Sequence, residues 1–173
     1  MKIIKIPYTP RPQQRMLHEK LSKYRFSVIV MHRRAGKTVW AINHLIKLAL
    51  TSGKKNFRGA FFSPTRVQSK LIGWDYLKEF SRVIPGMKYN ETELRADFPN
   101  GARITLFGAE NPDASRGQFF DQVVCDEYAQ MDARMFAEII RPAIADRLGS
   151  CTFIGTPAGM GNNFYDLFEE AKS

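Results

Sequence analysis

The chain has 173 residues, of which 44% are hydrophobic and 25% charged, and it carries a formal net charge of +9. No apolar run approaches the roughly 18 residues of a membrane-spanning helix, and the N-terminus lacks the apolar core of a signal peptide. These properties exclude a membrane or secreted protein and favour one soluble, intracellular domain, residues 1–173.

The charge is distributed unevenly along the chain. The first 70 residues carry 16 Lys or Arg and the single acid Glu19, whereas residues 71–173 carry 10 Lys or Arg and 16 Asp or Glu. Any single lysine is best explained as a solvated side chain. A segment this one-sided instead suits a polyanionic partner, a neighbouring subunit of matching charge, or both.

The first predicted elements frame a loop. An irregular start over residues 7–12 precedes a helix near residues 13–24 and a strand over residues 26–31. The strand breaks into Gly36-Lys37-Thr38, and apolar residues then recur near a period of 3.6 up to Leu50. A buried strand, a Gly-Lys-Thr sequence and a helix in this order predict a phosphate-binding loop.

The chemistry of this loop follows from its residue types. A helix N-terminus offers unpaired N–H groups and the positive end of the helix dipole to an anion. Gly36 allows close approach of the backbone, Lys37 can neutralise terminal phosphates, and Thr38 can place its hydroxyl on Mg²⁺. Met31 stands where the usual pattern has its first glycine, so an ordinary helix start is the alternative interpretation.

The middle of the chain continues the alternation of strands and helices. Residues 59–63 read as a buried strand, and Thr65 is expected to cap a helix that runs to about Val83. Residues 93–107 alternate between apolar and polar around the turn Pro99-Asn100-Gly101, which predicts a β-hairpin. We expect this hairpin to add antiparallel strands to one edge of the sheet.

Two adjacent acids follow the next apolar strand, residues 122–125. Asp126 at the end of that strand would face the metal of a bound nucleotide, and Glu127 could orient and deprotonate an attacking water. The alternative is that both acids cap a helix beginning near Asp132. The phosphate loop upstream favours the first interpretation and makes ATP hydrolysis the expected chemistry.

The last predicted strand, residues 151–155, ends at Thr156, which we expect to act as a sensor of the γ-phosphate; ordinary turn chemistry at Gly-Thr-Pro is the alternative. Cys125 and Cys151 both lie within predicted strands and read as reduced core residues. The whole pattern predicts an α/β fold with a mostly parallel sheet, helices on both faces and an antiparallel hairpin at one edge.

Five segments resemble the ATPase part of the large terminase subunit, the DNA-packaging motor of tailed bacteriophages, a P-loop NTPase of the recA-like type. Residues 10–14 match its adenine motif, and residues 33–38 match its variant Walker A loop. Residues 63–70, followed by Trp74, match the strand-to-helix segment after that loop. Residues 123–127 match its Walker B strand with the catalytic glutamate, and residues 154–157 match its coupling motif.

The resemblance implies further site residues. The matching adenine-recognition amide is Gln14, and Arg33, Arg34 and Ala35 belong to the ATP-binding loop. Arg116 would act as an arginine finger on the ATP of a neighbouring subunit, where a guanidinium neutralises charge on the transferred phosphoryl group. A local salt bridge of Arg116 with Asp113 or Asp121 is the alternative.

The resemblance also implies a biological setting. We expect ATP and Mg²⁺ as ligands, and double-stranded DNA, the portal protein and the small terminase subunit as partners, in a ring assembled at the procapsid in the host cytoplasm. The nuclease domain of the family is expected to be absent from this chain. Two alternatives remain, a helicase-like or remodelling ATPase and a nucleotide-sensing DNA-binding module with weak or no turnover.

Overall fold

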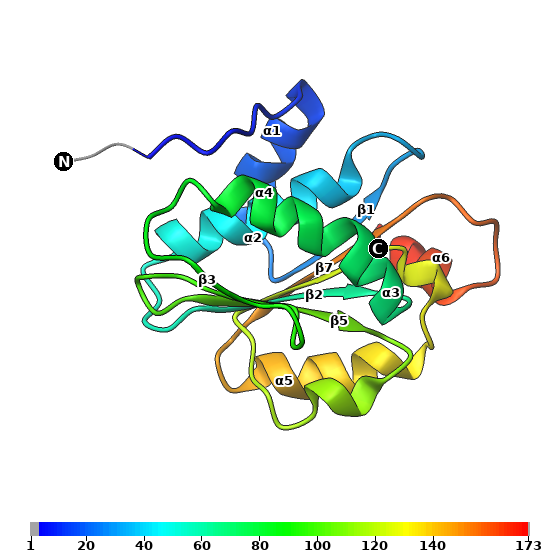
Figure 1. The fold of residues 1–173 in the computed structure, drawn as a ribbon. Coiled ribbons are helices and arrows are strands. Elements are labelled where there is room, and N and C mark those ends of the chain that lie inside the picture. Colours follow the sequence, from blue (N-terminus) through cyan, green and yellow to red (C-terminus); the bar gives the residue numbers. More distant parts are fainter. Residues whose placement is uncertain (1–3, 173) are drawn as a thin grey trace.

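The computed structural model describes residues 4–172, which form a seven-stranded sheet with helices on both faces (Figure 1). The strand order is β1-β7-β6-β2-β5-β4-β3. In that order the strands are Phe26–Val30, Ser150–Gly155, Gln122–Cys125, Arg58–Ser63, Arg103–Gly108, Arg95–Asp97 and Lys88–Asn90. The predicted α/β fold class is confirmed.

Five strands are parallel, and the predicted hairpin forms beside one edge of the sheet. The strands β1, β7, β6, β2 and β5 are parallel, whereas β4 and β3 run antiparallel to their neighbours. The hairpin consists of β4 and β5, which pair antiparallel, and β5 lies inside the sheet because it also pairs in parallel with β2. An inner position suits β5, whose residues Ile104 to Phe107 are all buried and of which only Thr105 is polar. The edge strand β3 was not predicted.

Three helices cover one face of the sheet and enclose the first of two hydrophobic cores (Figure 1). They are α1 (Pro12–Lys20), α2 (Lys37–Thr51) and α4 (Asp75–Ser81). The expected helix over residues 13–24 is α1 followed by a 3₁₀ turn, Leu21–Lys23. The predicted helix over 38–50 begins one residue earlier and ends one residue later.

The second face is covered by a π-helical stretch, Met135–Ile140, that continues into α5 (Arg141–Ala145). Their apolar side chains pack against β6 and β7 in the second core. A further helix, α6 (Asn163–Glu170), was not predicted; its N-cap Asn162 accepts hydrogen bonds from the amides of Phe164 and Tyr165. The two cores together bury both faces of the central strands.

The helix expected after Thr65 forms in three parts. It consists of α3 (Arg66–Gln68), a π-helical stretch (Ser69–Trp74) and α4, and Thr65 forms a capping box with Gln68. A Cβ at Gly73 would lie 2.9 Å from the Leu106 side chain, so this glycine allows the helix to approach the sheet closely. The predicted Thr65 cap is therefore confirmed.

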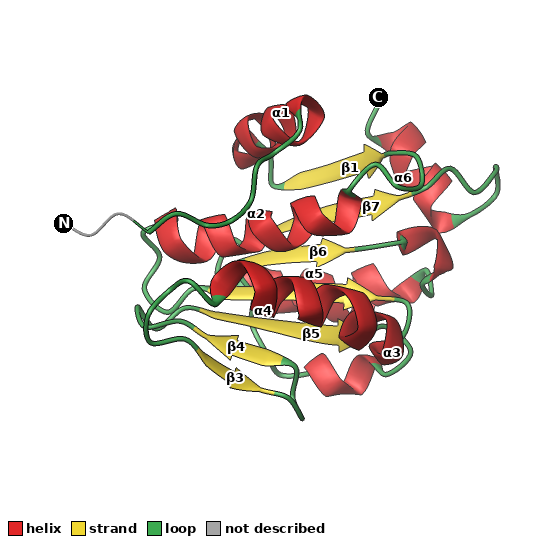
Figure 2. Cartoon of the chain, turned by 45° about the horizontal axis from the view of Figure 1, so that its top comes forward, coloured by secondary structure: helices red, strands yellow, loops and turns green. Residues whose placement is uncertain are grey.

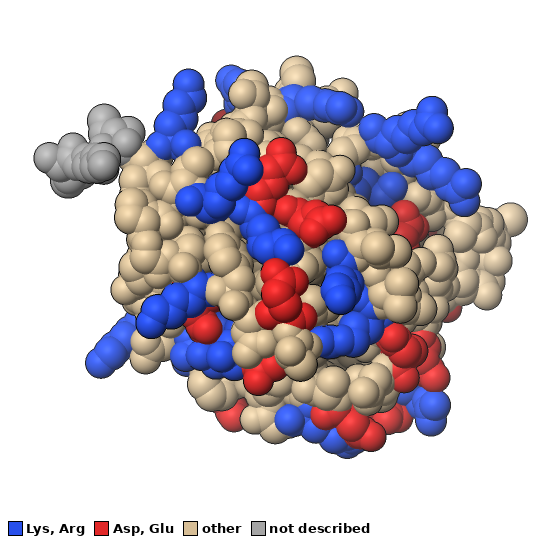
Figure 3. Space-filling model, in the orientation of Figure 1, with Lys and Arg blue, Asp and Glu red and all other residues tan. Residues whose placement is uncertain are grey.

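Charged side chains of both signs mix on the folded surface. On the face drawn in Figure 3, Asp and Glu side chains lie among the Lys and Arg side chains. Basic residues of the first half pair with acids of the second half, as in Lys54–Asp121 and Lys37–Glu127. The charge polarity of the sequence is thus not a polarity of this face.

Two further expectations concern the interior and the membrane. Cys125 and Cys151 are buried free cysteines on adjacent strands, as predicted. None of the helices within residues 4–172 combines the length and the apolar character needed to cross a bilayer.

Candidate nucleotide-binding site

The phosphate-loop residues lie between β1 and α2, at the edge of the sheet where the parallel strands end (Figure 2). Gly36 is the N-cap of α2 and has a left-handed backbone with φ of 79°. A Cβ there would also lie 2.7 Å from Gln14 Nε2. The left-handed backbone therefore favours glycine at this position, and the Gln14 amide would have to shift to admit a Cβ.

Lys37 is buried and its ammonium group meets three acceptors at the bottom of the loop. It donates to the His32 carbonyl at 3.2 Å and to Thr156 Oγ1 at 3.0 Å. Its Nζ also lies 3.6 Å from Glu127 Oε1. The structure thus brings together three side chains that the sequence placed on separate elements.

Thr38 and Asp126 form the second contact across the site, a hydrogen bond of 2.7 Å from Thr38 Oγ1 to Asp126 Oδ2. Asp126 is buried, and this desolvation raises the pKa of its carboxyl group, while the Thr38 hydrogen bond opposes the rise. A divalent cation would favour the ionised carboxylate.

The chemistry of this hydroxyl–carboxylate pair fits Mg²⁺, which prefers oxygen ligands and commonly takes one or two carboxylates together with water and substrate phosphates. Nowhere within residues 4–172 do three His, Cys, Asp or Glu side chains gather to hold a metal. Thr38 and Asp126 would therefore hold the ion together with nucleotide and water oxygens.

Glu127 connects the ends of two neighbouring strands, β6 and β7. Its Oε1 accepts a hydrogen bond from Thr156 Oγ1 at 3.2 Å, and its Oε2 accepts one from the Thr156 amide at 3.4 Å. The Glu127 backbone is left-handed, with φ of 53°, a conformation that costs a non-glycine residue about 1–3 kcal/mol. Strain of this kind concentrates at functional sites.

A cleft of about 120 Å³ opens beside these groups. It is lined by Thr38, Asp126 and Glu127 together with Ser63, Gln68 and others from the β2-to-α4 segment. Sequence reasoning assigned no role to Ser63 or Gln68. Their position directly after a parallel strand was the available signal, since such strand ends meet at one edge of a sheet.

Gln14 is buried beside the loop, whereas Gln13 is exposed, so the structure places the predicted residue of the two next to Gly36. Its Nε2 donates to the Gly36 carbonyl at 2.9 Å, and its Oε1 accepts from the Arg11 amide at 2.9 Å. The oxygen and the nitrogen of the Gln14 side-chain amide are therefore both hydrogen-bonded within the protein itself. A role in adenine recognition stays a prediction.

Three predicted arginines lie outside this cluster. Arg33 and Arg34 are exposed, and within the described residues neither side chain makes a hydrogen bond or ion pair. Arg116 is exposed and pairs with Asp113, which is the local salt bridge that the sequence left as an alternative. Its action on a neighbouring subunit stays a prediction.

Sequence reasoning also missed a buried polar cluster behind the loop. The Tyr8 hydroxyl lies 3.1 Å from His18 Nε2, and His18 Nδ1 lies 3.2 Å from His44 Nδ1. These contacts join α1 to α2. The signal was the spacing of Gln14 and His18, four residues apart on one helix, which puts both on the same buried face.

The fold and the contacts of Lys37 define a class of protein, the P-loop nucleoside triphosphatases of the recA-like type. Within this class, residues 28–172 match the family described as "Terminase large subunit, T4likevirus-type, N-terminal". The chain belongs to this family, and the resemblance seen in the sequence is confirmed.

Individual relatives agree with this assignment. The chain is 25% identical to the terminase large subunit of Thermus virus P23-45, over 93% of this chain and 36% of that protein. It therefore spans about a third of the length of the curated relatives that it matches.

Solved structures share the fold. The ATPase domain of the Thermus phage P74-26 large terminase has a TM-score of 0.78 at 23% identity, covering 94% of this chain and 70% of that one. The HK97 bacteriophage large terminase has a TM-score of 0.80 at 14% identity, covering 96% and 37%. A large terminase of a thermophilic bacteriophage, solved in complex with ADP, has a TM-score of 0.68 at 16% identity, covering 83% and 38%.

Proposed function

We propose that this domain hydrolyses ATP with Mg²⁺ and that, in the assembled motor, hydrolysis drives double-stranded DNA into a procapsid. The observation that carries the proposal is the contact of Lys37 with both Glu127 and Thr156. It joins a phosphate-binding cation, a candidate base and a candidate sensor at one point. Family membership and the ADP complex of a structural neighbour support the choice of nucleotide.

Each group has a distinct part in the reaction. Lys37 and the first amides of α2 neutralise the β- and γ-phosphates. Thr38 and Asp126 would hold Mg²⁺, which supplies charge neutralisation on the phosphate oxygens. Glu127 accepts a proton from the attacking water as the new P–O bond forms and the bond from the γ-phosphorus to the bridging oxygen breaks, leaving ADP and phosphate.

Thr156 is suited to report on the γ-phosphate. Its hydroxyl contacts both Lys37 and Glu127, and it follows β7 directly. A change in the Lys37 contacts on hydrolysis would therefore reach β7 through Thr156. This is the proposed coupling between chemistry and movement.

The assembled setting is part of the proposal. In it, several copies form a ring at the portal with the small terminase subunit, in the host cytoplasm, and Arg116 of one copy reaches the ATP of the next. Support comes from family membership and from the exposure of Arg116, whose side chain is 60% accessible. An arginine supplied in trans ties hydrolysis to assembly.

Two alternatives are weighed against this proposal. A nucleotide sensor without turnover has no need of a base, and the placement of Glu127 against Lys37 and Thr156 counts against it. A helicase-like ATPase shares the same strand-end residues. Strand separation by the full-length protein, measured on a labelled duplex with an overhang, would contradict the packaging assignment and support the helicase-like alternative.

The test of hydrolysis is phosphate release by wild type and by Glu127→Gln. We expect the variant to lose at least about 10²-fold in rate, because a general base contributes that much, while binding of a fluorescent ATP analogue is retained. Glu79→Gln, which changes an exposed acid on α4, is the matched control and should keep the wild-type rate. Equal rates for Glu127→Gln and wild type would refute the catalytic assignment.

A further inference from the structure

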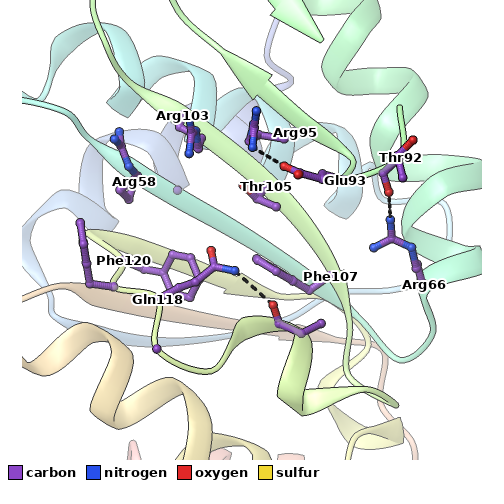
Figure 4. A pocket seen from close by; sticks show the side chains of 14 residues that line it. Arg58, Arg66, Thr92, Glu93, Arg95, Arg103, Thr105, Phe107, Gln118 and Phe120 are labelled. Atoms are coloured by element: carbon purple, nitrogen blue, oxygen red, sulfur yellow. Dashed lines mark hydrogen bonds and ion pairs between the residues drawn. The ribbon is translucent and has the colours of Figure 1, made fainter. Parts of the chain in front are cut away.

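The sheet carries a groove on the face opposite α2 and α4. Alternate residues of β5 and β4 point to opposite sides, so Ile104 and Ala96 lie in the first core and Arg103 and Arg95 lie on the other face. On that face, a groove of about 650 Å³ opens beside β4 (Figure 4). Figure 4 shows Gln118 and Phe120 across from the arginines.

A row of mostly basic residues crosses the sheet at this groove and includes two of its lining residues, Arg58 and Arg103. Arg58 and Arg103 are register partners on neighbouring strands, and Asp97 is the register partner of Arg103 on the other side. The next position holds Lys88 of β3, opposite Asp97. Neighbouring strands lie about 4.8 Å apart, so three cations and one acid form a continuous row across four strands.

The acids nearby do not neutralise the arginines. Arg95 and Arg103 share Asp97, with contacts of 3.1 Å and 2.6 Å, and Arg95 also pairs with Glu93. The Arg58 guanidinium donates only to backbone carbonyls. The groove is lined by four arginines, at positions 58, 66, 95 and 103, and by one acid, Glu93. Even with Asp97 and with Glu110, which accepts from the Arg66 amide, the groove keeps a net positive charge.

The positive charge of the groove affects the pKa of Arg58. Burial lowers the pKa of its guanidinium, and repulsion from Arg103 and Arg147 lowers it further. Asp97 and Asp121 offset part of this effect. The Asp121 carboxylate also accepts hydrogen bonds from Lys54, Arg147 and the Arg58 amide, so it is shared among several cations. Like charges on neighbouring strands are destabilising, so an anion in the groove would be held strongly.

The groove favours one kind of anion. The backbone of β5 is hydrogen-bonded to β2 and β4, so a peptide laid on this face finds no free main-chain groups for strand addition. Guanidinium groups match phosphate oxygens with paired donors. Phe119 is 45% exposed beside the groove, and the Arg147 guanidinium lies 4.9 Å from the centre of its ring.

We propose that this arginine groove binds the phosphodiester backbone of a nucleic acid strand. The inference deepens the proposed function, on which it rests for the identity of the polymer, by naming the surface that contacts DNA. Arg58, Arg103 and Arg66 are the principal phosphate contacts. Arg66 follows β2, whose last residue Ser63 lines the nucleotide cleft.

The test measures binding of a fluorescently labelled DNA duplex to the chain by anisotropy over a range of salt concentrations. Arg103→Gln and Arg66→Gln should each weaken binding about 5- to 10-fold and lower the salt slope by about 1, as expected for one lost phosphate contact. Arg103→Lys keeps the charge and should retain the slope. Arg82→Gln, which removes an exposed arginine of the α4 end, is the control and should bind as wild type.

Three outcomes overturn the inference. These are unchanged binding by both groove variants, an equal loss in Arg82→Gln, and displacement of the duplex by poly-glutamate at equal charge concentration, which would assign the groove to an acidic protein. Circular dichroism melting checks that each variant folds. If Arg103→Gln does not fold, Arg66→Gln decides, since the Arg66 guanidinium contacts only the Thr92 carbonyl.

Phosphate release by the wild-type chain keeps this inference apart from the proposed function. Groove-dependent DNA binding by a wild-type chain that releases no phosphate would refute the proposed hydrolysis and leave the DNA surface intact. Phosphate release without groove-dependent DNA binding would do the reverse.

Discussion

The buried pair of histidines behind the phosphate loop predicts a loss of stability at mildly acid pH. His18 and His44 are both buried, their Nδ1 atoms are 3.2 Å apart, and Lys47 lies nearby. Burial lowers the pKa of His18 to about 4, and the positive charge of Lys47 makes a smaller contribution. Burial likewise lowers the pKa of His44 to about 3, with smaller contributions from His18 and Lys47. Both rings are therefore neutral in the folded protein at neutral pH.

The sign and size of the effect follow from linkage. The unfolded chain takes up a proton on each ring below about pH 6.5, whereas the folded chain does not until about pH 4, so stability falls as the pH falls through this window. At pH 5 each histidine lowers the free energy of unfolding by about 2 kcal/mol, and the pair lowers it by about 4 kcal/mol. The loss acts on the packing of α1, which carries Gln14, against α2.

The assay is urea unfolding followed by circular dichroism at pH 7 and pH 5. We expect His44→Gln to show about half the wild-type pH dependence, because one of the two titrating rings is gone while burial and Lys47 still lower the pKa of His18. The chain has three histidines, and the third, His32, is exposed. His32→Gln is therefore the control and should keep the wild-type pH dependence. An unchanged pH dependence in His44→Gln would refute the linkage argument.

Three further predictions concern the site. Gly36→Ala should lower the free energy of unfolding by about 1–3 kcal/mol in thermal or urea denaturation, because of its left-handed backbone and the nearby Gln14 amide. Asp126→Asn should weaken the Mg²⁺ dependence of nucleotide binding in a titration with a fluorescent analogue, and an unchanged dependence would place the ion elsewhere. Mixing Arg116→Ala with Lys37→Ala subunits in the full motor should partly restore ATP hydrolysis, and no rescue at any mixing ratio would exclude action in trans.

Much of the arrangement of the candidate nucleotide site was predictable because its parts are local. Gly36, Lys37 and Thr38 are consecutive, and the strand before them and the helix after them show in the periodicity of adjacent residues. The acid pair Asp126 and Glu127 follows an apolar strand directly. Parallel strands bring their carboxyl ends to one edge, so local motifs at strand ends were sufficient to expect one site.

The details of that site depended on side-chain geometry. Local sequence could not show that Lys37 contacts Thr156. Nor could it show that the Gln14 side-chain amide is hydrogen-bonded to the Gly36 carbonyl and the Arg11 amide. These contacts join elements that are distant along the chain. Their distances are set by how α1 and β7 pack against the loop.

By itself, the sequence determined the α/β class and the order of the main elements, and it pointed to the candidate phosphate loop and acid pair. Period, turn residues and motif spacing act over short stretches of chain, so they can be recognised locally. Only the tertiary structure decided that β5 lies inside the sheet, that His18 meets His44, and that Arg58 and Arg103 lie side by side. The physical reason is that strand pairing and side-chain burial depend on which distant segments compete for the same surface. No local pattern records that competition.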